Sequence, residues 1–245
     1  MTTDQELLRN NKAHWDKVSK NFDKNPWGIL HMKLSRKLLS HVLKAAPFDK
    51  ESSEVMDFGC GNGFNSSLLA LDSKALVGVD ISNGMVEEYN RNVEKWGFNK
   101  IPSTKGKVKA VCADITNKEA ALPSELEGRK FDIIFCCMTY HYLPDINDTT
   151  RALASFLKPG GTLLVIDWVQ PAIPLELSEE QRSLIKVPGI SEQEMRAAFD
   201  DAGLQFRSYE PVVTMDDSVE DKQIHNTAFL ACADKEEMEV FGGFA

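Results

Sequence analysis

A glycine-rich turn with an acid in front of it is the part of this sequence whose spacing could do chemistry. In the stretch VMDFGCGNG, Asp57 precedes Gly59, Gly61 and Gly63. A backbone without side chains can adopt unusual dihedral angles and approach a ligand closely. The spacing differs from the GxGxxG of dinucleotide sites, and no Lys-Ser/Thr pair follows as in a phosphate loop. Because a carboxylate repels a pyrophosphate and attracts an ammonium group, we interpret the turn as a cradle for a cationic ligand without phosphate.

Two more aspartates follow the next β-rich runs. Asp80 ends LVGVD, and Asp114 follows the run that contains Val111 and Cys112. In a doubly wound sheet, an acid at the tip of the second strand can accept hydrogen bonds from a ribose diol. Each acid by itself could instead be a helix N-cap. Three acids at successive strand tips favour a nucleoside pocket.

The elements that must position these residues alternate between strand and helix from residue 54 onward. Helical stretches at 64–71, 83–96, 118–127 and 146–157 separate β-rich runs at 55–58, 75–79, 108–112, 131–136 and 162–168. This alternation predicts an α/β fold with a doubly wound, mainly parallel sheet. Two last β-rich runs, at 204–214 and 225–233, bring the sheet to seven strands and predict that the last strand is antiparallel. A capping-box pattern, Ser191 to Glu194, predicts a helix before them.

The flanking segments predict the organisation of the domain. Apolar residues at helical spacing predict helices over 4–22 and 31–46, separated by Pro26 and Gly28. We expect residues 1–50 to form a helical cover over a core at 51–168. Residues 169–190, which contain three prolines, are expected to form a lid or insert that is mobile without substrate. Residues 191–245 would complete the same domain with a helix and a strand pair.

Composition excludes several classes of function. The formal net charge of -9 disfavours non-specific binding of nucleic acid. Five cysteines without a CxxC pair favour neither a disulfide framework nor a zinc site. No apolar run approaches the roughly 20 residues of a membrane span. The first residues are too polar for a signal peptide, so we expect a cytoplasmic protein that binds no membrane. The oligomeric state stays open.

Five motifs, in order, resemble those of class I S-adenosylmethionine-dependent methyltransferases. They are VMDFGCGNG, LVGVDIS, CADI, FDIIFCCMTYHYLPD and LKPGGTLLVID, which together cover about residues 54–168. The resemblance implies that S-adenosyl-L-methionine is the cofactor. It also implies a set of cofactor-binding residues: Asp57, Gly59, Cys60, Gly61, Asp80, Ile81, Met85, Asp114, Ile115 and Cys136.

The same resemblance implies a role for several members of this set. Asp57 would lie near the amino group of the methionine part, and Asp80 would hold the ribose hydroxyls. Ile81 and Met85 would flank the adenine, and Cys136 would line the pocket near the sulfonium.

The methyl acceptor is less defined than the cofactor. His141, in MTYHY, is a candidate general base, or it shapes the turn by a hydrogen bond to a backbone carbonyl. The Asn/Asp-Pro-Pro-aromatic motif of adenine- and glutamine-modifying enzymes is absent here. We therefore expect a small-molecule substrate. The alternatives are a specific protein or RNA target, a non-catalytic methyltransferase-like partner subunit, and a nicotinamide dehydrogenase of similar topology.

Overall fold

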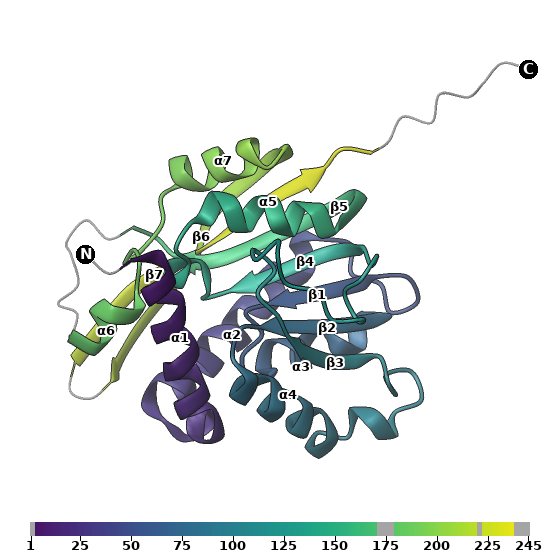
Figure 1. Cartoon of the computed structure of the whole chain (residues 1–245), viewed down its shortest axis with the longest axis horizontal. Helices are drawn as coiled ribbons and strands as arrows, with labels where there is room; N and C mark the ends of the chain where they lie inside the picture. The colour runs from purple at the N-terminus through teal and green to yellow at the C-terminus, as the bar shows by residue number, and fades with distance from the viewer. Residues whose placement is uncertain (1–2, 171–178, 220–221, 238–245) are drawn as a thin grey trace, which may run out of the picture.

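A seven-stranded sheet forms the centre of the chain in the computed structural model, which describes residues 3–170, 179–219 and 222–237. The strand order is β3-β2-β1-β4-β5-β7-β6 (Figure 1). Neighbouring strands are parallel except where β7 pairs with β5 and β6, so β7 is the one antiparallel strand of this sheet. The predicted fold class is confirmed. The strands are β1 (Glu54–Phe58), β2 (Ala75–Asp80), β3 (Val108–Cys112), β4 (Phe131–Cys137), β5 (Leu157–Trp168), β6 (Leu204–Val219) and β7 (Lys222–Lys235).

The N-terminal helices begin at side-chain caps. Thr3 and Glu6 form a capping box at the start of α1 (Asp4–Val18), which is followed by the 3-10 helix η1 (Ser19–Lys24). Asn25 caps α2 (Pro26–Ala45) by accepting from the backbone N–H of Gly28. The prediction that Pro26 and Gly28 separate two helices was wrong about Gly28. Proline is favourable at the first helical position because its missing N–H would have no partner there, and Gly28 lies in the first turn.

The helices between the strands agree with the predicted alternation, with one exception. The segment 118–127 forms turns rather than a helix. Pro123 interrupts it, and the Asn117 side chain accepts from the backbone N–H of Glu119, which favours a turn. The observed helices are α3 (Phe64–Leu69), α4 (Asn83–Lys95), α5 (Ile146–Phe156), α6 (Glu179–Leu184) and α7 (Glu192–Asp201), with 3-10 turns η2 (Ala70–Asp72), η3 (Phe98–Lys100) and η4 (Tyr140–Tyr142).

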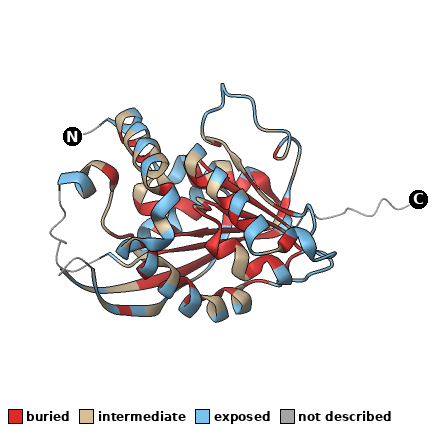
Figure 2. Ribbon diagram, turned by 90° about the horizontal axis from the view of Figure 1, so that it is seen from below, coloured by how far each residue is buried: buried red, intermediate tan, exposed pale blue. Residues whose placement is uncertain are grey.

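The core lies on both faces of the sheet, because successive residues of a strand point to opposite sides. Val55 and Ile133 belong to a cluster with α2 and α4, whereas their neighbours Met56 and Ile134 belong to a cluster with α5 and α7. The buried residues are concentrated in the strands and on the inward faces of these helices (Figure 2). The two helical layers therefore hold the strands, and the loops at the strand ends, in fixed positions.

Strand order reverses between β1 and β4, because the chain runs outward to β2 and β3 before it returns to β4. Ligands bind at such switch points, beyond the carboxyl ends of the strands. The β6–β7 hairpin contacts α2. Residues 171–178, which belong to the predicted lid, lie outside the described residues. In the ranges that the structure describes, no helix is long and apolar enough to cross a membrane.

Candidate functional site

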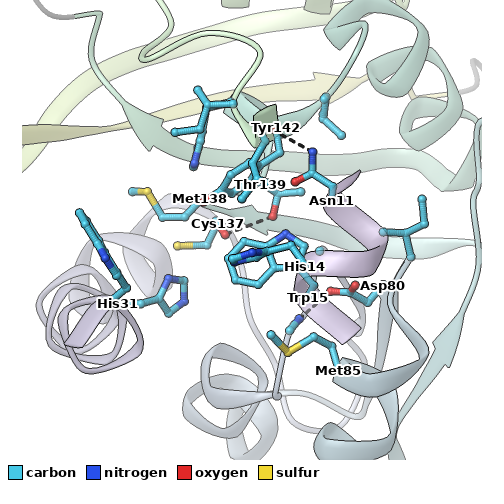
Figure 3. A pocket seen from close by; sticks show the side chains of 18 of the residues that line it. Asn11, His14, Trp15, His31, Asp80, Met85, Cys137, Met138, Thr139 and Tyr142 are labelled. Atoms are coloured by element: carbon cyan, nitrogen blue, oxygen red, sulfur yellow. Dashed lines mark hydrogen bonds between the residues drawn. The ribbon is translucent and has the colours of Figure 1, made fainter. Parts of the chain in front are cut away.

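A cavity of about 820 Å³ lies where β1, β2, β3 and β4 end. Its lining comes from the glycine turn after β1, from the loops after the neighbouring strands, from α1, η1, α2 and α6, and from the first residues of β7. Asp80 and Met85 lie on one side, whereas His31 lies on the other, with Cys137 to Thr139 between them (Figure 3). The volume falls in the range of about 300–1,000 Å³ that is typical of small-molecule sites.

The glycines of the turn have two different roles. Gly59 has a φ of +68°, and a Cβ there would come within 2.1 Å of the Thr139 Oγ1 atom. Gly59 therefore lacks a side chain so that Thr139, two residues after β4, can pack against its backbone. Gly61 has a φ of +51°, and a Cβ there would meet no atom within 4 Å. Gly61, with Gly59 and Cys60, is part of the cavity lining, and it leaves room for a ligand to approach the backbone.

Asp80 holds this turn in place and presents its carboxylate to the cavity. Its Oδ2 accepts from the backbone N–H of Gly61 at 2.9 Å, and its Oδ1 accepts from the backbone N–H of Ser82 at 2.9 Å. Burial raises the pKa of Asp80, and the two backbone donors oppose this shift. Each carboxylate oxygen has a second lone pair, so the group can still accept hydrogen bonds from a ligand.

Asp57 lies behind the turn rather than on the cavity wall. It is 1% exposed, and its Oδ2 accepts from the Ser66 hydroxyl at 2.6 Å. Among the residues that the structure describes, its Oδ1 has no hydrogen-bond partner. Burial raises the pKa of Asp57 to about 7, and the neighbouring Asp80 contributes to the shift. A contact of Asp57 with a ligand stays a prediction, because the residue is not among those that line the cavity.

Cys136 does not line the cavity, so its predicted place on the wall was wrong. Alternation along β4 sends Cys136 into the cluster with α5 and α7, and Cys137 to the face that carries α2. Cys137 lines the cavity instead (Figure 3). The strand period could have identified it, since Val55, Ile133, Phe135 and Cys137 share one face of the sheet.

The other residues of the predicted nucleoside end all line the cavity. They come from the end of β2, the residue after it, the first turn of α4 and the loop after β3. Asp114 forms a turn in which its Oδ1 accepts from the backbone N–H and the hydroxyl of Thr116. Met85 lies in the first turn of α4 and is 2% exposed. The fold thus brings together residues that are far apart in the sequence: Asp80, Ile81, Met85, Asp114 and Ile115.

His141 lies in η4 and is held by a buried acid. Its Nδ1 is 2.7 Å from Asp167 Oδ1, and its backbone N–H donates to Asp167 Oδ2 at 3.1 Å. Asp167 is fully buried at the end of β5. A carboxylate on Nδ1 makes that nitrogen the proton-bearing one, which leaves Nε2 as an acceptor. The predicted alternative, a ring bond to a backbone carbonyl, is not found in the described part of the chain.

Sequence reasoning missed Asp167 and Asp16. Asp16, on α1, accepts through Oδ1 from the Ser82 hydroxyl at 2.6 Å and from the backbone N–H of Gly84 at 2.9 Å. It therefore joins α1 to the first turn of α4, beside Asp80. Asp167 is the penultimate residue of the predicted fifth strand of the core, and this was a usable signal, because the tips of parallel strands meet at one edge. The sequence around Asp16 gave no comparable signal.

The chain matches the family model described as a methyltransferase domain over residues 30–209, and it belongs to that family. The fold is that of the class I S-adenosylmethionine-dependent methyltransferases, and S-adenosylmethionine is the cofactor of this family. The curated relatives include an uncharacterized methyltransferase of Schizosaccharomyces pombe. It is 33% identical over 121 residues, which are 49% of this chain and 40% of that protein.

Two further comparisons agree with this family. A malonyl-[acyl-carrier protein] O-methyltransferase of Acetivibrio thermocellus is 29% identical over 65% of this chain and 48% of that protein. The matches thus span less than half of the length of both curated relatives. Among solved structures, the magnesium protoporphyrin IX methyltransferase of Synechocystis with bound SAM has a TM-score of 0.62. It is 14% identical, over 94% of this chain and 97% of that one.

The site fits the cofactor of the family on two observations. The open space at Gly61 lets a ligand approach the backbone, and the Asp80 carboxylate faces that space. S-adenosylmethionine has no phosphate and a net positive charge, because its ammonium group and sulfonium outweigh its one carboxylate. This suits a cavity whose charged lining side chains, in the described residues, are carboxylates. Asp80 would hold its ribose hydroxyls, and the apolar side chains of Ile81, Met85 and Ile115 would contact its adenine.

Proposed function

We propose that this chain transfers the methyl group of S-adenosylmethionine to a small-molecule acceptor. The observation that supports this proposal is one cavity whose two sides carry different functional groups. One side has the Gly61 turn and Asp80, and the other has His141 with Asp167 behind it. A cofactor and a small acceptor can therefore lie in the same space.

The bound cofactor supplies an electrophilic methyl group, and its sulfur leaves as a neutral thioether. The protein therefore needs no acid for the leaving group, and its main tasks are alignment and removal of the acceptor's proton. His141 is suited to the second task because Asp167 fixes its tautomer with Nε2 as the free acceptor. For a hydroxyl acceptor, the oxygen gains the methyl group, the C–S electron pair stays on sulfur, and the proton goes to Nε2.

The walls of the cavity favour a small acceptor over a macromolecule. Trp15 of α1 packs edge-on against Tyr142 at 5.5 Å between ring centroids, and Asn11 of α1 donates to the Leu184 carbonyl of α6 at 2.8 Å. Both α1 and α6 also contribute residues to the cavity lining, which supports a covering role for them. We propose that residues 1–50 and the 169–190 segment cover the bound substrate, as the domain prediction states.

Calorimetry with S-adenosylmethionine and S-adenosylhomocysteine tests the cofactor half of the proposal. A methyl-transfer screen of phenols, thiols, amines and carboxylic acids tests the other half. We expect binding of both compounds and turnover with at least one acceptor class. Absence of binding would refute the proposal, and binding of NADH instead would favour the dehydrogenase alternative. Tight binding without turnover in any class would favour a non-catalytic subunit.

A further inference from the structure

Five aromatic side chains form a continuous belt around the acceptor side of the cavity. In order, the rings of His31, Phe22, Trp15, Tyr142 and His141 lie 5.9, 6.0, 5.5 and 3.9 Å apart between neighbouring centroids. All five line the cavity, and they come from α2, η1, α1 and η4. We call these five residues the aromatic belt. Edge-to-face and stacked contacts with such rings favour a planar aromatic ligand.

The cavity offers no fixed positive charge to an acceptor. Among its lining residues in the described part of the chain, none is a lysine or an arginine. His31, at one end of the aromatic belt, does not replace them. Burial lowers the pKa of His31 to about 4, and the nearby His141 contributes to this shift. His31 is therefore neutral at pH 7, and an anionic acceptor would lose its hydration without gaining an ion pair.

A cationic acceptor finds no carboxylate partner at the aromatic belt, so the ring faces alone offset the hydration that it loses. The lining carboxylates Asp80 and Asp114 belong to the nucleoside side, and Glu180 is an exposed residue that lies 3.2 Å from His14 Nδ1. Asp167 faces the Nδ1 side of His141 and is fully buried. What the belt does offer are polar ring atoms, namely the Nε2 atom of His141, which has no hydrogen-bond partner among the described residues, and the ring of His31, whose Nε2 is 3.4 Å from Asn65 Nδ2.

We propose that the aromatic belt selects an uncharged, planar aromatic acceptor with a hydroxyl group, and that it rejects carboxylates and ammonium compounds of the same shape. This inference rests on the proposed function and names the substrate class of the same site. The hydroxyl proton passes to His141 Nε2. The other ring proton stays on Nδ1 and remains hydrogen-bonded to Asp167. The imidazolium that results lies beside a buried carboxylate, which stabilises it until the proton leaves to water.

The experiment measures binding rather than turnover, with three probes of one shape. 2-Naphthol, 2-naphthoate and 2-naphthylmethylamine are neutral, anionic and cationic at pH 7. Each is titrated into the protein saturated with S-adenosylhomocysteine and followed by calorimetry. We expect 2-naphthol to bind about tenfold more tightly or better than either charged probe, because the carboxylate gains no ion pair at the aromatic belt and the rings offset only part of the hydration that the ammonium group loses.

Two substitutions at one position test the role of charge. His31→Arg should raise the affinity for 2-naphthoate by about tenfold, whereas the neutral variant His31→Asn should not. Thermal melts and S-adenosylhomocysteine affinity show that each variant is folded with its cofactor side intact.

The possible results separate this inference from the proposed function. If S-adenosylhomocysteine binds but a charged probe binds as tightly as 2-naphthol, or none of the three probes binds, the inference is wrong and the proposed function stands. If S-adenosylhomocysteine itself does not bind, the proposed function fails and the inference fails with it.

Discussion

Asp167 holds His141 through two bonds at once, one from the ring Nδ1 at 2.7 Å and one from the backbone N–H at 3.1 Å. The acid comes from the end of β5 and the histidine from the turn after β4, and these two strands are paired neighbours. The double contact fixes both the position of η4 and the tautomer of the ring. The pair can therefore act as a positioned general base.

Replacement of the acid should change the tautomer of the base. In Asp167→Asn, an amide donor can face Nδ1 and shift the ring proton to Nε2, so Nε2 can no longer accept. We expect methyl transfer to a hydroxyl acceptor to fall by about 10²-fold or more, with cofactor affinity unchanged. Two-bond ¹H–¹⁵N spectra of the imidazoles would report the tautomer directly.

The exposed pair His225 and Asp216 offers a matched control for this test. His225 Nδ1 also bonds an aspartate, but both side chains are about three-quarters exposed and neither residue is among those that line the cavity. Asp216→Asn should leave turnover unchanged. Equal losses in the two variants, or a wild-type tautomer in Asp167→Asn, would remove the base assignment.

Loss of the Asp80 carboxylate should weaken the cofactor site. Asp80→Ala removes a ligand acceptor and leaves the backbone N–H groups of Gly61 and Ser82 without their partner. Hydrogen bonds to a charged group contribute about 1.5–3 kcal/mol, so affinity for S-adenosylhomocysteine should fall by about ten- to a hundredfold. Calorimetry measures this, with Asp200→Ala on the exposed face of α7 as the control. Unchanged affinity in Asp80→Ala would show that the ribose is held elsewhere.

Two glycines with similar backbone conformations separate backbone strain from ligand contact. Gly61 and Gly97 have φ values of +51° and +83°, and a Cβ at either position meets no atom within 4 Å. Alanine at either position should cost roughly 1–2 kcal/mol of stability through the left-handed conformation. Only Gly61→Ala should lower cofactor affinity, because Gly97 is not part of the cavity lining. Urea unfolding and calorimetry provide the two measurements, and equal cofactor affinity in both variants would contradict the role of Gly61.

Asp57 should make the protein less stable as the pH rises toward neutrality. Burial raises its pKa from the ordinary 3.8 to about 7, so the folded state binds the proton more tightly than the unfolded state. At pH values between these two pKa values, the free energy of unfolding decreases as the pH rises. The total decrease that this one group causes is on the order of 4 kcal/mol. Asp57→Asn removes this contribution. We expect the stability of the variant relative to the wild type to increase from pH 4 to pH 7 in urea unfolding, and a difference independent of pH would show that Asp57 is not perturbed.

Much of the fold could be predicted because it depends on local patterns. The alternation of strand and helix identified the parallel strands, and the Ser191 capping box marked the start of α7 correctly. The helix predicted at 118–127 was wrong because Pro123 and the Asn117 turn outweighed a weak apolar pattern. The two-residue period of the strand could also have identified Cys137 as the cavity residue. The prediction of Cys136 was wrong because Cys137, and not Cys136, lies on the face of β4 that packs against α2.

The sequence by itself determined the family, the glycine turn and the acids at the strand tips, because these depend on residue type and short spacing. Only the tertiary structure decided which groups share the cavity. Gly59 is bare because of Thr139, which lies 80 positions further along the chain, and His141 is oriented by Asp167 from a different strand. The aromatic belt likewise joins α1, η1 and α2 to η4. Such contacts depend on strand order and helix packing, which bring distant residues together and which no local pattern encodes.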